Sequence, residues 1–262
     1  MYSKYQNYLM TLDQDTISST DFKSNTAYHS ILEHVSQKYG NEYLQLIKDE
    51  FSDITNEQIT EYVQLNDQYG SPKYKLHEYQ DMIIECSPTS LRYVYHALLI
   101  LKHYDARECK NMVEVGCGYG GLCLAIDYFA KLLNIQIGTY NLIDLKEPLN
   151  LITNYTQLHS IDLNLMYHDC DTFGRDINNE ELFFISNYCF TEINQELNKS
   201  YSEILLPKVK NGFITWQNGG NGGTYPVSDA PTILNKEVEL IVDERPQTDS
   251  GKGICTNYYV YF

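Results

Sequence analysis

Residues 112–121 constrain the fold of this chain more than any other segment. They read Met-Val-Glu-Val-Gly-Cys-Gly-Tyr-Gly-Gly: a short apolar strand, then glycines at 116, 118, 120 and 121, before a helix expected to begin near Leu122. Glycine has no Cβ, so the chain can adopt a positive φ and a ligand can approach the backbone closely. Open amides at the start of the helix would face that ligand. The segment therefore predicts a nucleotide-like ligand at a strand–turn–helix unit, and a tight turn without a ligand is the alternative.

Two classes of cofactor use such a turn. The spacing of Gly116, Gly118 and Gly121 fits the G-x-G-x-x-G fingerprint of dinucleotide-binding proteins. With Glu114, the glycines also resemble E-x-G-x-G-x-G, the first motif of S-adenosylmethionine (SAM) methyltransferases. An anion before the turn suits a cationic aminoacyl-sulfonium ligand better than a pyrophosphate, which prefers positive surroundings. Glu114 therefore favours SAM.

Composition and charge exclude several partners. The 262 residues, 43% of them hydrophobic, suffice for one α/β domain with a smaller appendage. A net charge of −16 would repel nucleic acids and anionic membranes, so neither is expected as a partner. No window approaches the roughly 18 apolar residues of a membrane span.

The cysteines and the first residues bear on the compartment. The start, Met-Tyr-Ser-Lys-Tyr-Gln-Asn, has no apolar signal core, and the seven cysteines (86, 109, 117, 123, 170, 189 and 255) include no C-x-x-C pair. We therefore expect reduced thiols in a cytoplasmic protein. The bias toward tyrosine, asparagine and isoleucine indicates an AT-rich genome, such as that of a bacterium or a large DNA virus, whose protein would occupy the host cytoplasm.

The N-terminal part, residues 1–105, is expected to be a helical cap or lid. Apolar residues at helical spacing predict a helix that ends at Gly40 and a second that ends near Phe51, and Thr55 can cap a third. Ser87-Pro88 is a good start for a further helix that reaches about residue 104. This part could be a lid, a dimer interface or both, which leaves a homo-oligomer open.

The C-terminal part, residues 106–262, alternates strands and helices. Strands are expected at 112–115, 137–143, 163–168, 181–186 and 212–216, with helices at 122–133, at 147–159 and from the fourth strand to about 206. Such alternation predicts a parallel sheet with right-handed crossovers. Two last strands, 237–242 and 258–262, have no helix between them and fit an antiparallel edge hairpin.

Candidate binding residues lie where strands end, because open α/β sheets bind ligands beyond the carboxyl ends of their strands. Asp144 ends the second strand, where a carboxylate can accept both ribose hydroxyls of NAD or SAM. Asp169 ends the third strand and could bind the adenine amino group. For both, a plain turn residue is the alternative. His168-Asp169-Cys170-Asp171 could also suggest a divalent metal, but no further cluster supports one and no metal is expected.

A general base is expected beyond the fourth strand, where a transferred group would meet its acceptor. Asn187 and Glu192 follow that strand. A hydroxyl acceptor is a poor nucleophile at neutral pH and gains from a base within hydrogen-bond reach. Glu192 is the first choice for this catalytic base and His168 the second. A glutamate that merely compensates the helix dipole explains Glu192 equally well.

Four segments together resemble a known family. They are Ser-Pro-Thr-Ser-Leu-Arg-Tyr (87–93), Val-Glu-Val-Gly-Cys-Gly-Tyr-Gly-Gly-Leu (113–122), Leu-Ile-Asp-Leu (142–145) and Ile-Ser-Asn-Tyr-Cys-Phe-Thr-Glu-Ile (185–193). They resemble the sugar O-methyltransferases, class I SAM-dependent enzymes of surface-glycan biosynthesis. Gly70-Ser71-Pro72 looks like the Gly-x-Pro turn of that family, and the resemblance covers about residues 65–220.

The resemblance implies a Rossmann-like class I methyltransferase fold: an α/β protein with a seven-stranded, mostly parallel sheet, an antiparallel C-terminal hairpin and a helical N-terminal extension. It implies SAM as cofactor, S-adenosylhomocysteine as product and a sugar or nucleotide-sugar acceptor. The candidate cofactor residues are Glu114, Gly116, Cys117, Gly118, Gly120, Asp144, Leu145, Asp169 and Asn187. The candidate acceptor residues are Tyr69, Arg92, Tyr188 and Asn218, of which Arg92 could instead meet the cofactor carboxylate.

The sequence departs from the family pattern in two places, and two other functions stay open. Lys146 and Glu147 stand where proline usually follows the Asp-Leu pair, and residues 189–191 replace a more polar segment, so acceptor specificity could differ. One alternative is an NAD-dependent sugar-nucleotide dehydrogenase or epimerase, although no suitable Tyr-x-x-x-Lys pair is found. The other is a non-catalytic SAM-fold or glycan-binding module.

Overall fold

The computed structural model describes residues 2–12, 17–29, 31–218, 225–247 and 257–262. Cys255, expected to be a reduced thiol, lies outside these residues. The chain forms two compact units. Unit 1 comprises Met1–Leu99, Gly118–Leu133 and Glu147–Asp162, and unit 2 comprises Ile100–Cys117, Asn134–Lys146 and Leu163–Phe262. The contacts thus do not divide the chain at one boundary near residue 105, and a separate role for residues 1–105 stays a prediction.

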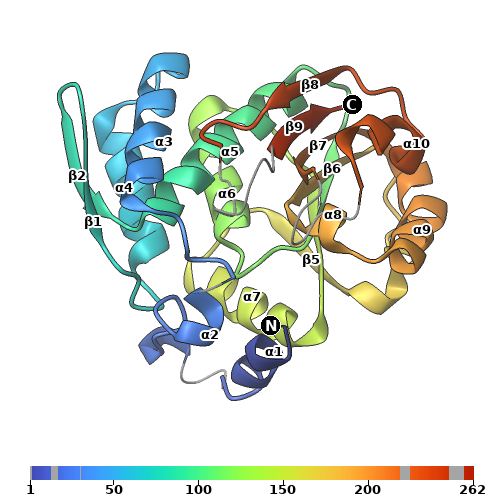
Figure 1. The fold of residues 1–262 in the computed structure, drawn as a ribbon, viewed down its shortest axis with the longest axis horizontal. Helices are drawn as coiled ribbons and strands as arrows, with labels where there is room; N and C mark the ends of the chain where they lie inside the picture. Colours follow the sequence, from blue (N-terminus) through green and yellow to red (C-terminus); the bar gives the residue numbers. More distant parts are fainter. Residues whose placement is uncertain (1, 13–16, 30, 219–224, 248–256) are drawn as a thin grey trace. The chain divides into compact units, whose positions relative to one another are not determined.

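Unit 2 contains a seven-stranded sheet of order β5-β4-β3-β6-β7-β9-β8 (Figure 1). Its strands are β3 (Asn111–Val115), β4 (Thr139–Asp144), β5 (Asn164–Asp169), β6 (Leu182–Asn187), β7 (Val209–Gln217), β8 (Leu240–Asp243) and β9 (Asn257–Tyr261). The five strands from β5 to β7 are parallel, whereas β9 is antiparallel to both β7 and β8. The predicted α/β fold, with a mostly parallel sheet and an antiparallel C-terminal hairpin, is therefore confirmed.

The helices of unit 2 follow β6 and β7. They are α8 (Cys189–Glu192), α9 (Gln195–Ile204) and α10 (Ala230–Leu234). The single helix expected to run from the end of β6 to about residue 206 is wrong, because Ile193 is extended and Asn194 starts a new helix. The Asn194 side chain accepts a hydrogen bond from the Leu197 amide at 3.0 Å, which satisfies one of the open amides at that helix start.

Unit 1 holds most of the helices and a hairpin that the sequence did not reveal. Its elements are α1 (Tyr2–Leu9), α2 (Thr26–His29), α3 (Gln37–Glu50), α4 (Asn56–Asp67), β1 (Lys75–Tyr79), β2 (Met82–Cys86), α6 (Gly121–Leu133) and nearly all of α7 (Lys146–Leu158). Helix α5 (Pro88–Asp105) starts in unit 1 and ends in unit 2. Along the described ranges, no helix combines the length and apolarity needed to cross a membrane.

The helix predicted to end at Gly40 is wrong. Helix α3 begins after Ser36, whose side chain accepts a hydrogen bond from the Tyr39 amide, and runs straight through Gly40. A Cβ at Gly40 would collide with the imidazole of His77 on β1, since its Nδ1 lies only 2.8 Å from that position. Gly40 therefore lets the helix and the hairpin pack closely and does not stop the helix. The capping role of Thr55 is confirmed, with a full capping box to Gln58.

Aromatic side chains form much of the core of unit 1. The Tyr119 ring lies 5.0 Å from that of Tyr155 and 5.6 Å from that of Phe22, centroid to centroid, with steep angles between the ring planes. Edge-to-face pairs of this kind add to the stability that area burial provides. The abundance of tyrosine in the sequence thus has a structural use. Each buried hydroxyl then needs a hydrogen-bond partner, and Tyr155 finds one in the carbonyl of Asn66 at 3.0 Å.

The core of unit 2 centres on Phe184 of β6. Its ring lies 5.4 Å from that of Phe190 on α8 and 6.4 Å from that of Phe262, and its side chain is fully buried. Removing a buried phenyl ring leaves a cavity that the surrounding side chains fill only in part.

We expect Phe184→Ala to lower the free energy of unfolding by about 3–5 kcal/mol. Leu240→Ala on β8, where the side chain is 51% exposed, should change it by no more than about 0.5 kcal/mol. Chemical denaturation with both variants tests this, and equal effects would contradict the placement of Phe184 in the core.

Candidate functional site

The glycine turn and the end of β4 meet at the carboxylate of Asp144. Within unit 2, the Cys117 amide donates to Asp144 Oδ2 at 2.7 Å and the Leu145 amide donates to Oδ1 at 2.8 Å. The amide of Gly116 donates to the Ile143 carbonyl at 3.0 Å. Four of the predicted cofactor residues are thus brought together, and Asp144 is fixed at the carboxyl end of its strand, where open α/β sheets bind ligands.

Position 116 needs glycine for two reasons, its backbone conformation and the closeness of a neighbouring side chain. Its φ is +82°, a value that L-residues rarely adopt. A Cβ at this position would overlap the Cβ of Cys189 on α8 and lie 2.5 Å from its Sγ. Burial, with added repulsion from Asp144 and Glu192, raises the pKa of the Cys189 thiol well above its usual value. Cys189 is therefore a neutral packing group against the turn.

The sequence suggested that Glu114 carries a permanent negative charge, and its surroundings in the structure differ from that expectation. It is 2% exposed, and its Oε2 accepts a hydrogen bond from the Tyr140 hydroxyl at 2.8 Å. Burial raises the pKa of Glu114 to about 8; the bond from Tyr140 opposes this shift and the charge of Asp144 adds to it. The carboxyl is therefore readily protonated near neutral pH, which weakens the argument that its charge selects the cofactor.

The end of β6 carries two unusual side chains. Asn187 accepts a hydrogen bond from the Thr215 hydroxyl at 2.7 Å, yet its Nδ2 is buried and has no hydrogen-bond partner among the described residues. Tyr188 has a φ of +66°, rare for a bulky residue, and its hydroxyl donates to the carboxylate of Glu244. A buried unpaired donor and a strained backbone at one strand end are typical of a binding site.

No motif in the sequence pointed to Glu244. It follows the last strand residue of β8, is fully buried, and also accepts a hydrogen bond from Asn257 Nδ2 at 2.9 Å. Both of these donors belong to other segments of the chain, so only the folded structure brings them to this carboxylate. Glu244 holds the Tyr188 side chain in place at the carboxyl edge of the sheet.

The two candidate bases are placed very differently. Glu192 ends α8 and is exposed. His168 is 5% exposed, and its Nε2 and Nδ1 lie 3.0 Å from Asn141 Oδ1 and 2.8 Å from Asp176 Oδ2. Burial raises the pKa of Asp176, but hydrogen bonds with His168 and Thr172 and the charge of His168 together outweigh this, and the net pKa is lowered. Both nitrogens of His168 are thus engaged by side chains of unit 2, and its role as the second candidate base stays a prediction.

Asp169 and Asn218 have local roles in unit 2. Asp169 Oδ1 accepts a hydrogen bond from the Asp171 amide at 3.0 Å and caps a short 3-10 helix, Cys170–Thr172. The ligand atoms of Asp169, Cys170 and Asp171 lie within 4.8 Å of one another, a spacing common among acidic groups without a metal. Asn218 Oδ1 accepts from the Val227 amide at 2.6 Å.

The turn continues in unit 1 at Gly118, where a Cβ would meet no close contact. Its φ is +63°, and a Cβ there would find its nearest neighbours at ordinary contact distance, Leu32 at 3.6 Å and the Tyr93 hydroxyl at 3.7 Å. Gly121 is different, because a Cβ would lie 2.6 Å from the Tyr93 ring and 2.7 Å from that of Tyr119. A Cβ therefore fits at Gly118 without a collision, whereas at Gly121 it would collide with two aromatic rings.

The remaining predicted residues of unit 1 are Gly120, Tyr69 and Arg92. Gly120 has a φ of +93°. The Tyr69 ring packs against that of His159, 5.2 Å between centroids. Arg92 is 5% exposed, and its guanidinium donates to the Leu32 carbonyl at 3.1 Å.

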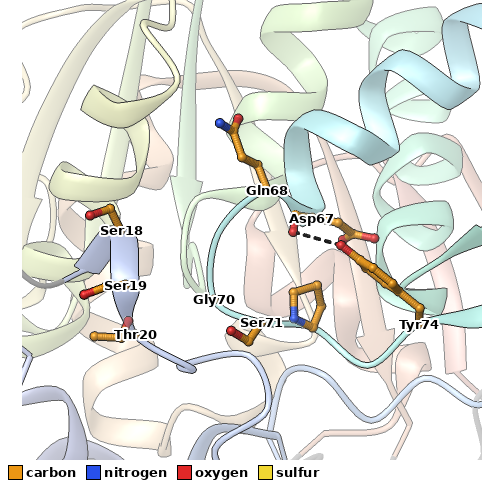
Figure 2. Close-up of a pocket in the computed structure, with 9 residues that line it drawn as sticks. Ser18, Ser19, Thr20, Asp67, Gln68, Gly70, Ser71 and Tyr74 are labelled. Atoms are coloured by element: carbon orange, nitrogen blue, oxygen red, sulfur yellow. Dashed lines mark hydrogen bonds between the residues drawn. The ribbon is translucent and has the colours of Figure 1, made fainter.

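Next to Tyr69 in the chain, a polar pocket opens in unit 1 (Figure 2). Its volume is about 350 Å³, and it is lined by Ser18, Ser19, Thr20, Asp67, Gln68, Gly70, Ser71, Pro72 and Tyr74. The Tyr74 hydroxyl donates to the Asp67 carbonyl at 3.4 Å. The Gly-x-Pro turn singled out in the sequence thus forms one wall of a pocket rich in hydroxyl groups.

Comparisons with known proteins bear on the fold. No family model and no curated protein matches the chain. A candidate O-methyltransferase from Nostoc punctiforme PCC 73102 is 10% identical with a TM-score of 0.46, over 86% of this chain and 72% of that one. The mitomycin 7-O-methyltransferase MmcR is 11% identical with a TM-score of 0.47, over 95% and 75% of the two chains. A SAM-dependent methyltransferase from Aquifex aeolicus is 18% identical with a TM-score of 0.46, over 66% and 91%. These likenesses are too distant to carry a functional argument.

Glu114 gives a prediction for stability against pH. Its pKa is raised from 4.5 to about 8 by folding, so the native state holds a proton that the unfolded chain releases in this range, and stability must fall as pH rises from 4.5 to 8. In Glu114→Gln this component is absent. We expect the free energy of unfolding of the variant, relative to the unaltered protein, to rise steadily in urea titrations at pH 5, 6.5 and 8. A constant difference would contradict the raised pKa.

The two halves of the turn should respond differently to alanine. Gly116→Ala adds both an unfavourable φ and a collision with Cys189, so we expect a loss of about 3 kcal/mol in unfolding free energy. Gly118→Ala adds only the φ strain, about 1 kcal/mol. Thermal and urea unfolding of both variants test this, and an equal or reversed order would show that the space at Gly118 is not open.

Proposed function

We propose that this protein is a SAM-dependent methyltransferase that transfers a methyl group to a hydroxyl oxygen. The observation that carries the proposal is the Asp144 carboxylate, held at the end of β4 against the Cys117 amide of the glycine turn. A carboxylate at this place accepts the ribose hydroxyls of a nucleoside cofactor. Each of its oxygens can accept more than one hydrogen bond, so the backbone amides do not use up its capacity.

The strand order favours SAM over a dinucleotide. In the dinucleotide-binding fold, the fifth strand of the sheet is followed by a sixth that is parallel to it. Here the place beside β7 is taken by β9, which runs antiparallel. The sheet thus departs from the dinucleotide pattern and has the form expected from the sequence resemblance to class I methyltransferases. The NAD-dependent alternative has no comparable support in the fold.

Several groups of unit 2 fit the reaction. SAM would supply an electrophilic methyl group on a sulfonium sulfur. Asp144 would orient the nucleoside, and the buried Asn187 Nδ2, which has no hydrogen-bond partner among the described residues, would donate to an oxygen or nitrogen acceptor on a ligand at the end of β6. Glu192 is the base proposed to accept the proton of the acceptor hydroxyl. Tyr188, held by Glu244, would contact the acceptor.

A sugar or nucleotide-sugar acceptor is the finer part of the proposal. It rests on the resemblance of residues 65–220 to the sugar O-methyltransferases. Surface-glycan biosynthesis and a cytoplasmic location belong to the same proposal.

The first test is calorimetric titration with SAM, S-adenosylhomocysteine and NAD. We expect the first two to bind and NAD not to bind. Asp144→Ala should weaken S-adenosylhomocysteine binding by about 10- to 100-fold, because a hydrogen bond to a charged acceptor is lost. Asp243→Ala, which removes an exposed carboxylate from β8, is the matched control and should bind as the unaltered protein does.

Binding of NAD alone would overturn the proposal, and binding of none of the three would favour a non-catalytic glycan-binding module. Once SAM binding is established, transfer of labelled methyl groups to a panel of nucleotide sugars and free sugars tests the acceptor class. Methylation of other hydroxyl compounds but no sugar would retain the methyltransferase and reject the sugar.

A further inference from the structure

The polar pocket of unit 1 is a feature that the proposed methyl transfer does not use. Its volume of about 350 Å³ lies at the lower end of the range of about 300–1,000 Å³ for small-molecule sites. One wall is the 3-10 helix Ile17–Ser19 with Thr20, and the other is the turn at 68–72 (Figure 2). All of the lining residues belong to unit 1, so the pocket is a property of that unit alone.

The turn forms a rigid wall of the pocket. Gly70 and Ser71 both have a positive φ, +87° and +50°. A Cβ at Gly70 would lie 2.7 Å from side-chain atoms of Phe22 and Lys23, which are both fully buried, and the Lys23 amide donates to the Gly70 carbonyl at 2.9 Å. The turn is thus packed against the core, which holds Ser71 in a conformation that serine rarely adopts. Strain of this kind collects at ligand sites, and a rigid wall reduces the entropy lost when a ligand binds.

The charge around the pocket limits the ligands that it can hold. Of the nine lining residues that the structure describes, only Asp67 has a charged side chain. It is 5% exposed, and its two oxygens accept hydrogen bonds from the Ser87 amide at 2.7 Å and the Ser90 hydroxyl at 2.6 Å. The buried Lys23 ammonium donates to the Asn66 carbonyl. Because phosphates and carboxylates bind to exposed Arg or Lys groups, the pocket suits an uncharged ligand.

The pocket offers neutral hydrogen-bonding groups and an aromatic ring. The side chains of Ser18, Gln68 and Ser71 are exposed and form no hydrogen bond with other described residues. A hydroxyl and a carboxamide can each donate and accept, as the neighbouring hydroxyl groups of a saccharide do. Tyr74 is 50% exposed, and its ring gives an apolar surface to the C–H groups of such a ligand. The lining therefore matches an uncharged, polyhydroxylated molecule.

We propose that this pocket binds one uncharged saccharide unit of a glycan, and that it does so without the cofactor. Ser18, Gln68 and Ser71 hydrogen-bond to the hydroxyl groups of the saccharide, and Tyr74 packs against its C–H face. The site uses neither the Asp144 carboxylate nor a bound nucleoside, so the inference goes beyond the proposed methyl transfer and is tested separately from it. It assigns the Gly-x-Pro turn a binding role of its own.

The test is saturation-transfer-difference NMR of the full chain without SAM, with the methyl glycosides of glucose, galactose, mannose and N-acetylglucosamine as probes. We expect saturable binding of at least one probe in the millimolar range. The methyl glycoside of the corresponding uronic acid carries a carboxylate and should bind more weakly, because the pocket gives it no cationic partner. Asp144→Ala should leave the affinity for the saccharide within about twofold, since the pocket does not include that residue.

Variants of two lining residues locate the binding in the pocket. Gln68→Ala removes a hydrogen-bonding group and should weaken the binding by about three- to tenfold. Tyr74→Ala removes the ring and should weaken it by about as much, whereas Tyr74→Phe keeps the ring and should stay within about twofold of the unaltered protein. Gln64→Ala removes an exposed carboxamide of α4 outside the pocket lining and is the matched control, with no change expected.

Two results would overturn the inference: no saturable binding of any probe, or binding that Gln68→Ala and Tyr74→Ala both leave unchanged. Tighter binding of the uronic acid would overturn the assignment of an uncharged ligand. The outcomes for the two proposals are distinct. SAM binding without saccharide binding rejects the inference and retains the proposed function, whereas saccharide binding without SAM binding rejects the proposed function and retains the inference.

Discussion

The carboxylate of Asp144 is the group on which the ligand end of unit 2 depends. Its two oxygens accept the amides of Cys117 and Leu145, so it joins the turn after β3 to the chain that leaves β4. Beside the bond from the Gly116 amide to the Ile143 carbonyl, this charged acceptor with two backbone amides gives a second link between the turn and the end of β4. The residue that would meet the ribose is therefore also the residue that shapes the turn. Binding and local structure cannot be separated at this position.

The glycines of the turn look alike in the sequence, but the structure requires them for different reasons. Gly116 combines a positive φ with close contact to Cys189. The Cys189 side chain occupies the space into which a Cβ at position 116 would project. Gly118 also has a positive φ, but a Cβ there would meet its nearest neighbours at ordinary contact distance and would not collide with them. The two glycines thus differ in what an added side chain would meet, which a consensus pattern cannot distinguish.

The strands of the large sheet were predictable from the sequence, whereas the hairpin β1–β2, the break between α8 and α9 and the contacts between distant segments were not. Strand–helix alternation gave the strands of the sheet to within a few residues, and strand ends pointed to Asp144. Gly40 was misread because its reason is the His77 ring, 37 residues away in the chain. Glu244 and Glu33 belong to no motif. Their partners come from other segments, so only the folded chain shows that one is satisfied and the other is not.

Two buried carboxylates of unit 1 show such a contrast. Asp67 accepts hydrogen bonds from the Ser87 amide at 2.7 Å and the Ser90 hydroxyl at 2.6 Å, one on each oxygen. Glu33, which shares Ser87 as a neighbour, has a donor on one oxygen only. Burying a carboxylate is costly, and burial raises the pKa of both groups although the charge of Lys23 and their hydrogen bonds oppose it. Asp67 has a donor on each oxygen and Glu33 has a donor on one, so the fold offsets the cost less completely for Glu33.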